Sequence, residues 1–403
     1  MNSLINATSL VPNGVVCMRS FAHDEVKPAG RWLRQSVTQL RRISRTHPEL
    51  AGNQSVYFLT NLGSALENVD PTSRTVTTAV RKSVQAIVHL FVALPVSTLM
   101  YDQWLEQLAA LLERENDRGQ CWQELAIHWG LLCKSPILAS YWADRWLPHI
   151  RQRWKLAQFK QPNSLACLAS LAASARWQEI LDLLAQQPIG FWPEQRFGVM
   201  ALAAQGKSTE ALTYAQHANP LGHEYRREIA ESCEAILLAQ GLRQRAYEEF
   251  AIIANQRQNH LRTFKVIAEK YPEKPPEQIF EDLVKSTPGE EGKWFRVAYE
   301  LRFFHLALEI SQTAPCDPKT LIHAAKEHST ADPTFACRVS LASLRWLAQG
   351  YGVSITANDV YQAYDMAIQS AADKPKVFKL MRQYCEGSHP AAQWLRELLA
   401  REL

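Results

Sequence analysis

The stretch LAAQGKSTEALTYAQ, residues 202–216, decides the fold. It contains a helical segment that ends in small residues, a tight turn at Gly206, and a second helical segment with Ala211 in its first turn. Glycine permits the left-handed backbone conformation with which helices commonly end. The small side chain after the turn lets two antiparallel helices approach closely. The stretch therefore predicts a helix–turn–helix unit.

The same pattern recurs along the chain. Its further copies are LAASARWQEILDLLAQ (171–186), LLAQGLRQRAYEEFAI (237–252) and AYELRFFHLALEISQ (298–312). The equivalent residues are Ile180, Ala211, Ala246 and Ala307, spaced by 31, 35 and 61 residues, and Ile279 of PPEQIFEDLV falls in the longest gap. A period of about 34 residues is typical of tetratricopeptide-type repeats. Any all-helical protein yields some such matches, but four copies in near register favour an α-solenoid.

The rest of the chain also predicts helices. No stretch alternates between apolar and polar residues with the period of a strand, so we expect an all-α fold without a sheet. Helices are expected from Pro28 to Pro48 and at about 53–68, 72–94, 97–116, 120–134, 136–158 and 163–173. We predict three parts: an irregular segment at 1–26, a helical N-terminal domain with a basic face at 27–160, and a tetratricopeptide-like repeat domain at 161–403.

Local signals mark helix ends in the repeat region. Asp317 and Asp332 each precede a proline, which predicts an N-cap followed by proline at the first helical position. Gly350 is expected to end a helix in the left-handed conformation. In GEEGKW (289–294), we expect Gly292 to permit a close turn, and the spacing is not that of a phosphate-binding loop.

The composition is that of a globular protein. Hydrophobic residues make up 47% and charged residues 21% of the 403 residues, which excludes long disorder. The longest apolar run, Val84–Leu94, is shorter than a membrane-spanning helix requires. The N-terminus has neither a basic region nor a sustained apolar region of the secretory type. We therefore expect a cytoplasmic protein with no membrane association.

The sequence indicates no metal site, cofactor or catalytic residue. The eight cysteines, at 17, 121, 133, 167, 233, 316, 337 and 385, form no CxxC pair. They are expected to be reduced, small buried residues. The histidines show no HxxxH spacing, and His89 and His128, within apolar helices, are more typical of core histidines than of catalytic bases.

Residues 225–364 add a family resemblance. The segments that carry it are AYEEFAIIAN, RTFKVIAEKYPEKPPEQIFEDLV, STPGEEGKWFRVAYELRFFHLALEIS, PCDPKTLIHAAKEH and SLRWLAQGYGVSITANDVYQAY. This region resembles a family of uncharacterised bacterial helical-repeat proteins, some of which are fused to a SWIM-type zinc-binding module. The resemblance implies a helical-repeat fold in a bacterial protein and no established activity. The CxCxH ligands of the SWIM module are absent, so no metal is implied.

The basic residues are concentrated near the N-terminus. Residues 1–100 hold ten Lys and Arg against five Asp and Glu, although the whole chain carries a net charge of only +4. On a helical wheel, Trp32, Leu33, Val37, Leu40 and Ile43 share one side, and Arg31, Arg34, Arg41, Arg42 and Arg45 share the other. No acidic residue occurs between Lys27 and Glu49. Such a face suits phosphate groups, which arginine can bind bidentately. The alternatives are a solvated face or a face that docks on acidic residues of the same protein.

A second basic stretch lies at 141–160 and alternates with aromatic residues. Its candidate binding residues are Arg151, Arg153, Lys155 and Lys160. Aromatic and basic side chains together can bind single-stranded nucleic acid. Trp142 and Trp146, four residues apart on a helix, are nevertheless more typical of core residues.

These observations favour a non-enzymatic interaction or scaffold protein. Helical-repeat arrays usually bind a protein partner in a long groove, and the basic helix suggests nucleic acid as a second partner. The alternative is a bacterial or phage-related toxin or defence effector with an unrecognised catalytic site. An enzyme should have a deep pocket on which polar groups converge, whereas a scaffold should have a broad groove.

Overall fold

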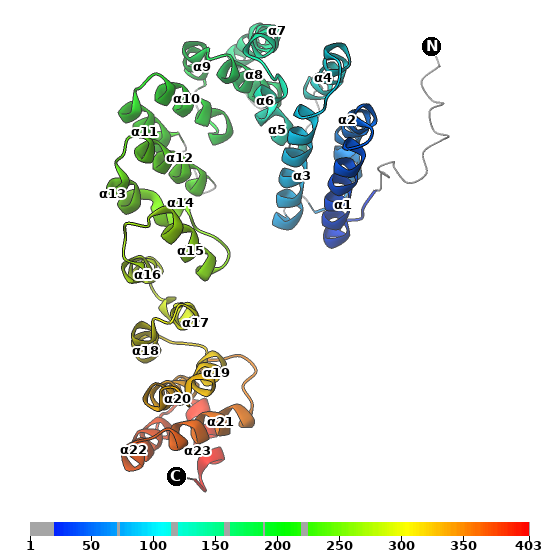
Figure 1. The fold of residues 1–403 in the computed structure, drawn as a ribbon. Coiled ribbons are helices and arrows are strands. Elements are labelled where there is room, and N and C mark those ends of the chain that lie inside the picture. The colour runs from blue at the N-terminus through cyan, green and yellow to red at the C-terminus, as the bar shows by residue number, and fades with distance from the viewer. Residues whose placement is uncertain are drawn as a thin grey trace. The chain divides into compact units, whose positions relative to one another are not determined.

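The computed structural model describes residues 20–70, 73–113, 120–156, 162–187, 190–218 and 225–402 (Figure 1). All regular elements in these ranges are helical, which confirms the predicted all-α class. The chain divides into two compact units, Met1–Ile236 and Leu237–Leu403. Of the predicted irregular segment 1–26, residues 1–19 lie outside the described residues. The predicted boundary near residue 160 concerns where the repeats begin, and it stays a prediction.

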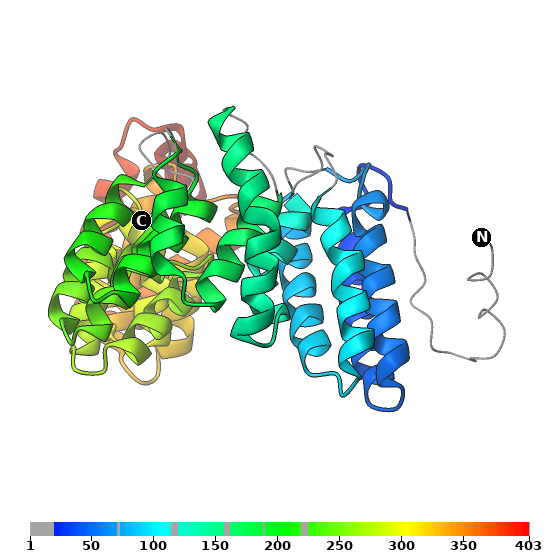
Figure 2. The ribbon, with the colours of Figure 1, turned by 90° about the horizontal axis from the view of Figure 1, so that it is seen from above.

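The helices of the first unit follow the apolar periodicity of the sequence. They are α1 (Val26–Ser44), α2 (Pro48–Ala65), α3 (Arg74–Val92), α4 (Thr98–Leu112), α5 (Gln120–Ile127), α6 (Trp129–Leu132), α7 (Pro136–Lys155), α8 (Pro162–Ala173), α9 (Trp177–Leu184), α10 (Trp192–Ala204), α11 (Ser208–His217) and α12 (Arg226–Ala239), which runs past the division. α1 packs against α2 and α3, and Figure 2 shows this group of helices from above. The helix expected at 120–134 is interrupted at His128.

The core of the first unit contains many large aromatic side chains. Trp129 contacts Trp142 and Trp146 at ring-centroid distances of 5.2 and 5.1 Å, and all three are buried. Burial of a large apolar side chain stabilises the fold by about 1.5–3 kcal/mol. The interpretation of Trp142 and Trp146 as core residues is therefore confirmed.

The helices of the second unit are shorter. They are α13 (Arg243–Ala246), η1 (Tyr247–Ala251), α14 (Ile252–Ala254), α15 (His260–Lys270), α16 (Pro276–Lys285), η2 (Glu291–Trp294), α17 (Phe295–Glu300), α18 (Phe304–Thr313), α19 (Pro318–His328), α20 (Pro333–Ala348), α21 (Ala357–Gln369), α22 (Lys374–Cys385) and α23 (Pro390–Leu399). α20 packs against α19, α21, α22 and α23. The predicted N-caps are confirmed, since Asp317 accepts a hydrogen bond from the Thr320 amide (3.0 Å) and Asp332 accepts one from the Phe335 amide (2.9 Å).

Turns of one geometry join helices at the predicted repeat positions. Before α11, Gly206 has a φ of +77°, the Lys207 amide donates to the Leu202 carbonyl (2.9 Å), and the Gly206 amide donates to the Ala203 carbonyl (3.0 Å). This pair of hydrogen bonds defines the Schellman motif. The same pair closes the turns at Ala175, Gly241, Arg302 and Gly350, all with positive φ. Gly350 therefore ends α20 as predicted.

The residues predicted to be equivalent occupy one structural position. Ile180, Ala211, Ala246 and Ala307 each donate a backbone hydrogen bond to the N-cap residue four positions earlier, and each is fully buried. Ile279 has the same position after Pro275 and is 1% exposed. The burial of Ala211, Ala246 and Ala307 agrees with the close helix approach that we expect after each turn.

Gly292 has a different role from the one expected. Its backbone lies in η2, and the residue with positive φ in this loop is Gly289. A Cβ atom at Gly292 would lie 1.8 Å from the carbonyl oxygen of Pro315. The prediction that Gly292 permits the turn was wrong, because this glycine is required for the close approach of two backbone segments.

Among the described helices, none is long and apolar enough to cross a membrane.

Candidate nucleic-acid interface

α1 separates its apolar and basic residues completely. The apolar residues of the predicted inner face, Trp32, Leu33, Val37, Leu40 and Ile43, are all buried. The Trp32 ring contacts Phe58 of α2 at a centroid distance of 5.1 Å, which fixes the rotation of α1 about its axis. The predicted outer face, Arg31, Arg34, Arg41, Arg42 and Arg45, is exposed at every position. The predicted division of the helix is therefore confirmed, and binding by this face stays a prediction.

The five arginines of this basic face have no carboxylate partner among the described residues. Glu25, at the start of the helix, accepts a hydrogen bond from the Ala22 amide (3.0 Å) instead. Like charges three and four residues apart on a helix repel one another. Within the described part of the chain, the face therefore presents five uncompensated positive charges to solvent.

α3 contributes further basic side chains that the candidate list from the sequence omits. Arg74 and Lys82 are exposed on this neighbouring helix, and α3 contains no acidic residue. Arg81 differs from them, because its Nε donates to Oε1 of Glu124 at 2.9 Å. The absence of acids from α3 is the sequence signal that could have identified Arg74 and Lys82.

The second basic stretch, on α7, is not an equivalent surface. Nη2 of Arg151 lies 3.8 Å from Oε2 of Glu179, which also binds Arg176. Arg153 is half-buried and Lys155 is exposed, while Lys160 lies outside the described residues. Since the tryptophans of α7 are core residues, they are not available to stack on nucleic acid bases. α7 packs against α8 and α1 packs against α2 and α3, so the two stretches belong to different parts of the unit.

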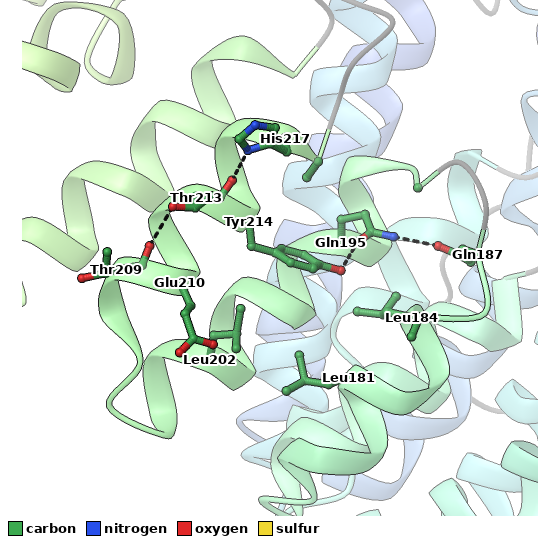
Figure 3. Close-up of a pocket in the computed structure, with 13 residues that line it drawn as sticks. Leu181, Leu184, Gln187, Gln195, Leu202, Thr209, Glu210, Thr213, Tyr214 and His217 are labelled. Carbon is green, nitrogen blue, oxygen red and sulfur yellow. Dashed lines mark hydrogen bonds between the residues drawn. The ribbon is translucent and has the colours of Figure 1, made fainter.

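A pocket of about 750 Å³ lies between α9, α10 and α11 (Figure 3). Leu181, Leu184 and Leu202 line its apolar side, and the ring of Tyr214 crosses it. The ring lies over Gly198 of α10, where a Cβ atom would approach it to 2.8 Å. The glycine therefore creates the space that the tyrosine occupies.

The polar groups of this pocket bind one another. The hydroxyl of Tyr214 donates to Oε1 of Gln195, and Nε2 of Gln195 donates to Oε1 of Gln187 at 2.9 Å. Behind them, the buried carboxylate of Glu194 accepts hydrogen bonds from Ser164 (2.8 Å) and Gln187 (2.5 Å). Burial raises the pKa of Glu194, and these two hydrogen bonds act in the opposite direction. The polar network joins α8, α10 and α11 and does not converge on the empty space.

A second pocket, of about 510 Å³, lies between α17 and α19 in the second unit. Its charged side chains have local partners: Arg296 pairs with Glu300 at 2.7 Å, Lys319 lies 3.7 Å from Asp359, and Glu327 lies 3.3 Å from His323. The hydroxyl of Tyr299 also donates to Glu327, at 3.2 Å. The polar groups of this pocket therefore bind one another, as those of the first pocket do.

The described cysteines are distributed as structural residues. Cys133, Cys167, Cys233, Cys316, Cys337 and Cys385 are all buried, as predicted, and Cys17 and Cys121 lie outside what the structure describes. Burial raises the pKa of Cys133, Cys167 and Cys316 to about 12, so these thiols are poor nucleophiles. In the described part of the chain, no group of three His, Cys, Asp or Glu side chains could hold a metal ion. His89 is exposed, so its interpretation as a core histidine was wrong.

No protein-family model matches the sequence, and no curated protein matches it significantly. The resemblance of residues 225–364 to bacterial helical-repeat proteins therefore stays a hypothesis.

Proposed function

We propose that this protein is a non-enzymatic interaction protein that binds the phosphate backbone of nucleic acid through the basic face of α1. One observation carries the proposal: five exposed arginines lie on one side of a well-packed helix and have no acidic partner in the described part of the chain. If the face had only a structural role, acidic residues four positions from the arginines would make the helix more stable. A phosphate backbone supplies the missing negative charges and releases counterions on binding.

The recurring turn supports a second part of the proposal. We infer that the helix pairs stack as a tetratricopeptide-like solenoid, which would bind a protein partner along a groove. The repeated Schellman turns and the buried residue after each turn are the features that such stacking requires.

The pocket between α9, α10 and α11 favours this function over an enzyme. Catalytic groups normally converge on the space where a substrate lies. Here Tyr214, Gln195 and Gln187 bind one another. The toxin or effector alternative would need a site elsewhere.

Charge reversal on α1 tests the proposal. Fluorescence anisotropy would measure binding of labelled single-stranded RNA, single-stranded DNA and duplex DNA at low salt. We expect Arg34→Glu/Arg41→Glu/Arg45→Glu to abolish binding. The matched control, Lys374→Glu/Lys376→Glu/Lys379→Glu on α22, changes the net charge equally at three exposed positions and should retain binding.

Thermal unfolding of both variants separates binding from folding. Exposed charges contribute little to stability, so both variants should unfold close to the wild-type temperature. A wild-type protein that binds none of the three nucleic acids, together with a destabilised α1 variant, would establish a purely structural role for the basic face.

A further inference from the structure

The arginines of the basic face are not evenly spaced along α1. A first group, Arg31 and Arg34, lies near the start of the helix, and a second group, Arg41, Arg42 and Arg45, lies at its end. At a rise of 1.5 Å per residue, the centres of the two groups are about 15 Å apart along the helix axis. The face therefore consists of two basic groups with a gap between them.

The gap presents exposed side chains that carry no charge. Gln35 and Thr38 are exposed there, and the hydroxyl of Thr38 donates to the carbonyl oxygen of Arg34 at 2.9 Å. The guanidinium of Arg34 lies away from the gap, since its Nη1 would be 3.7 Å from a Cβ atom at Gly30. Arg34 therefore extends back toward Arg31, and the two groups stay separate in the folded protein.

The exposed side of α1 has no ring on which bases could stack. Trp32 is the aromatic residue of this helix, and it is buried against Phe58 of α2. Proteins that bind single strands usually combine basic side chains with exposed aromatic rings that stack on the bases. The outer face of α1 therefore suits a duplex, whose bases are already stacked and whose phosphates face outward.

Carboxylates lie at both ends of the basic face. Glu25 precedes the first turn of α1, and Glu49 lies in the first turn of α2, directly after α1 ends. A strand that ran along the helix axis would pass both carboxylates, which repel phosphate groups. Strands that cross α1 at the two arginine groups would avoid them. We therefore expect the phosphates on two separate lines, one across each group.

We propose that α1 binds duplex DNA with its axis across the major groove, so that the first group contacts one strand and the second group contacts the other. The major groove is about 12 Å wide and the minor groove about 6 Å, so a spacing of about 15 Å matches the strands that flank the major groove. Phosphate contacts carry no sequence information, so binding is independent of sequence. This inference rests on the nucleic acid binding proposed above and names the form of nucleic acid bound.

The form of the nucleic acid is tested first, with anisotropy titrations of the full-length protein. We expect a short DNA duplex to bind roughly tenfold more tightly than either of its separate strands, because α1 has no ring to stack on unpaired bases. Duplex RNA of the same length should bind more weakly than duplex DNA, because its major groove is deep and narrow. A DNA duplex of unrelated sequence should bind as tightly as the first.

A half-neutral duplex, in which one strand carries uncharged methylphosphonate linkages, tests the contact with two strands. On it, the slope of the logarithm of affinity against the logarithm of salt should fall from about −4.5 to about −2.7 for the wild type, because only the second group finds phosphates. Arg31→Gln/Arg34→Gln removes the first group, so its slope should be about −2.7 on both duplexes. Both substituted positions are exposed, so the variant should unfold close to the wild-type temperature.

Three results would overturn the proposal and leave phosphate binding by the basic face intact. The wild type could keep its full slope on the half-neutral duplex, which would mean that α1 follows one strand. The separate strands, or duplex RNA, could bind as tightly as duplex DNA. Arg31→Gln/Arg34→Gln could lose as much slope as the wild type when one strand is neutral. A wild-type protein that binds no nucleic acid would instead overturn the proposed function itself.

Discussion

The basic face of α1 predicts a specific dependence of nucleic acid affinity on salt. Each arginine that neutralises a phosphate releases counterions, so the logarithm of the association constant falls linearly with the logarithm of salt concentration. The slope is about −0.7 per contact for single strands and about −0.9 for duplex DNA. Five exposed arginines therefore predict slopes of about −3.5 and −4.5. Between 50 and 200 mM salt, the affinity should fall roughly 130-fold for single strands and roughly 500-fold for duplex DNA.

Neutral substitutions test this count directly. Arg34→Gln/Arg41→Gln/Arg45→Gln leaves two of the five arginines, so the slope should fall to about −1.4 for single strands and about −1.8 for duplex DNA. The matched variant Lys374→Gln/Lys376→Gln/Lys379→Gln should keep the wild-type slope. Anisotropy titrations at four or more salt concentrations would give each slope. Equal slopes for all three proteins would refute the assignment of the contacts to α1, even if the wild type binds nucleic acid.

Two further predictions concern packing and pH. A Cβ atom at Gly130 of α6 would lie 2.4 Å from the Ala169 carbonyl oxygen of α8, whereas at Gly30 of α1 the nearest atom is 3.7 Å away. Urea unfolding should therefore show Gly130→Ala destabilised by about 1–3 kcal/mol through overpacking and Gly30→Ala stabilised by up to about 1 kcal/mol through helix propensity. Similar stabilities for the two variants would contradict the close contact of α6 and α8. Glu194 has its folded-state pKa raised above the ordinary 4.5 by burial, so its contribution to stability is complete below pH 4.5 and is lost as the pH rises through the raised pKa. Relative to Glu194→Gln, the wild type should lose up to about 1.4 kcal/mol of unfolding free energy per pH unit in that window. If the stability curves of the wild type and Glu194→Gln run parallel from pH 4 to 8, the pKa of Glu194 is not raised by folding.

The candidate interface on α1 could be predicted because it depends on local periodicity. Side chains three and four residues apart share one side of a helix, so the position of Trp32 and Leu40 on one arc predicts that Arg34 and Arg41 lie on the other. The turn at Gly206 could be predicted for the same reason, because glycine itself permits the left-handed backbone conformation. Neither inference requires knowledge of which helices are neighbours.

The second basic stretch shows where this reasoning fails. Arg151 has the sequence surroundings of a binding residue, yet it lies beside Glu179 of α9. The tryptophans of α7 face the core because Trp129 of α6 packs against them. Periodicity gives the arc on which a side chain lies, and the neighbouring helix decides whether that arc meets solvent, an acid or another ring.

The sequence by itself therefore determined the all-α class, the turn positions and the basic face of α1. Only the tertiary structure decided that Gly130 and Gly292 are required for close backbone contacts, and that Arg81 pairs with Glu124, 43 residues away. Backbone conformation and side-chain periodicity are set within a few residues, whereas the partner of a charge depends on helix packing between segments that the sequence does not place side by side.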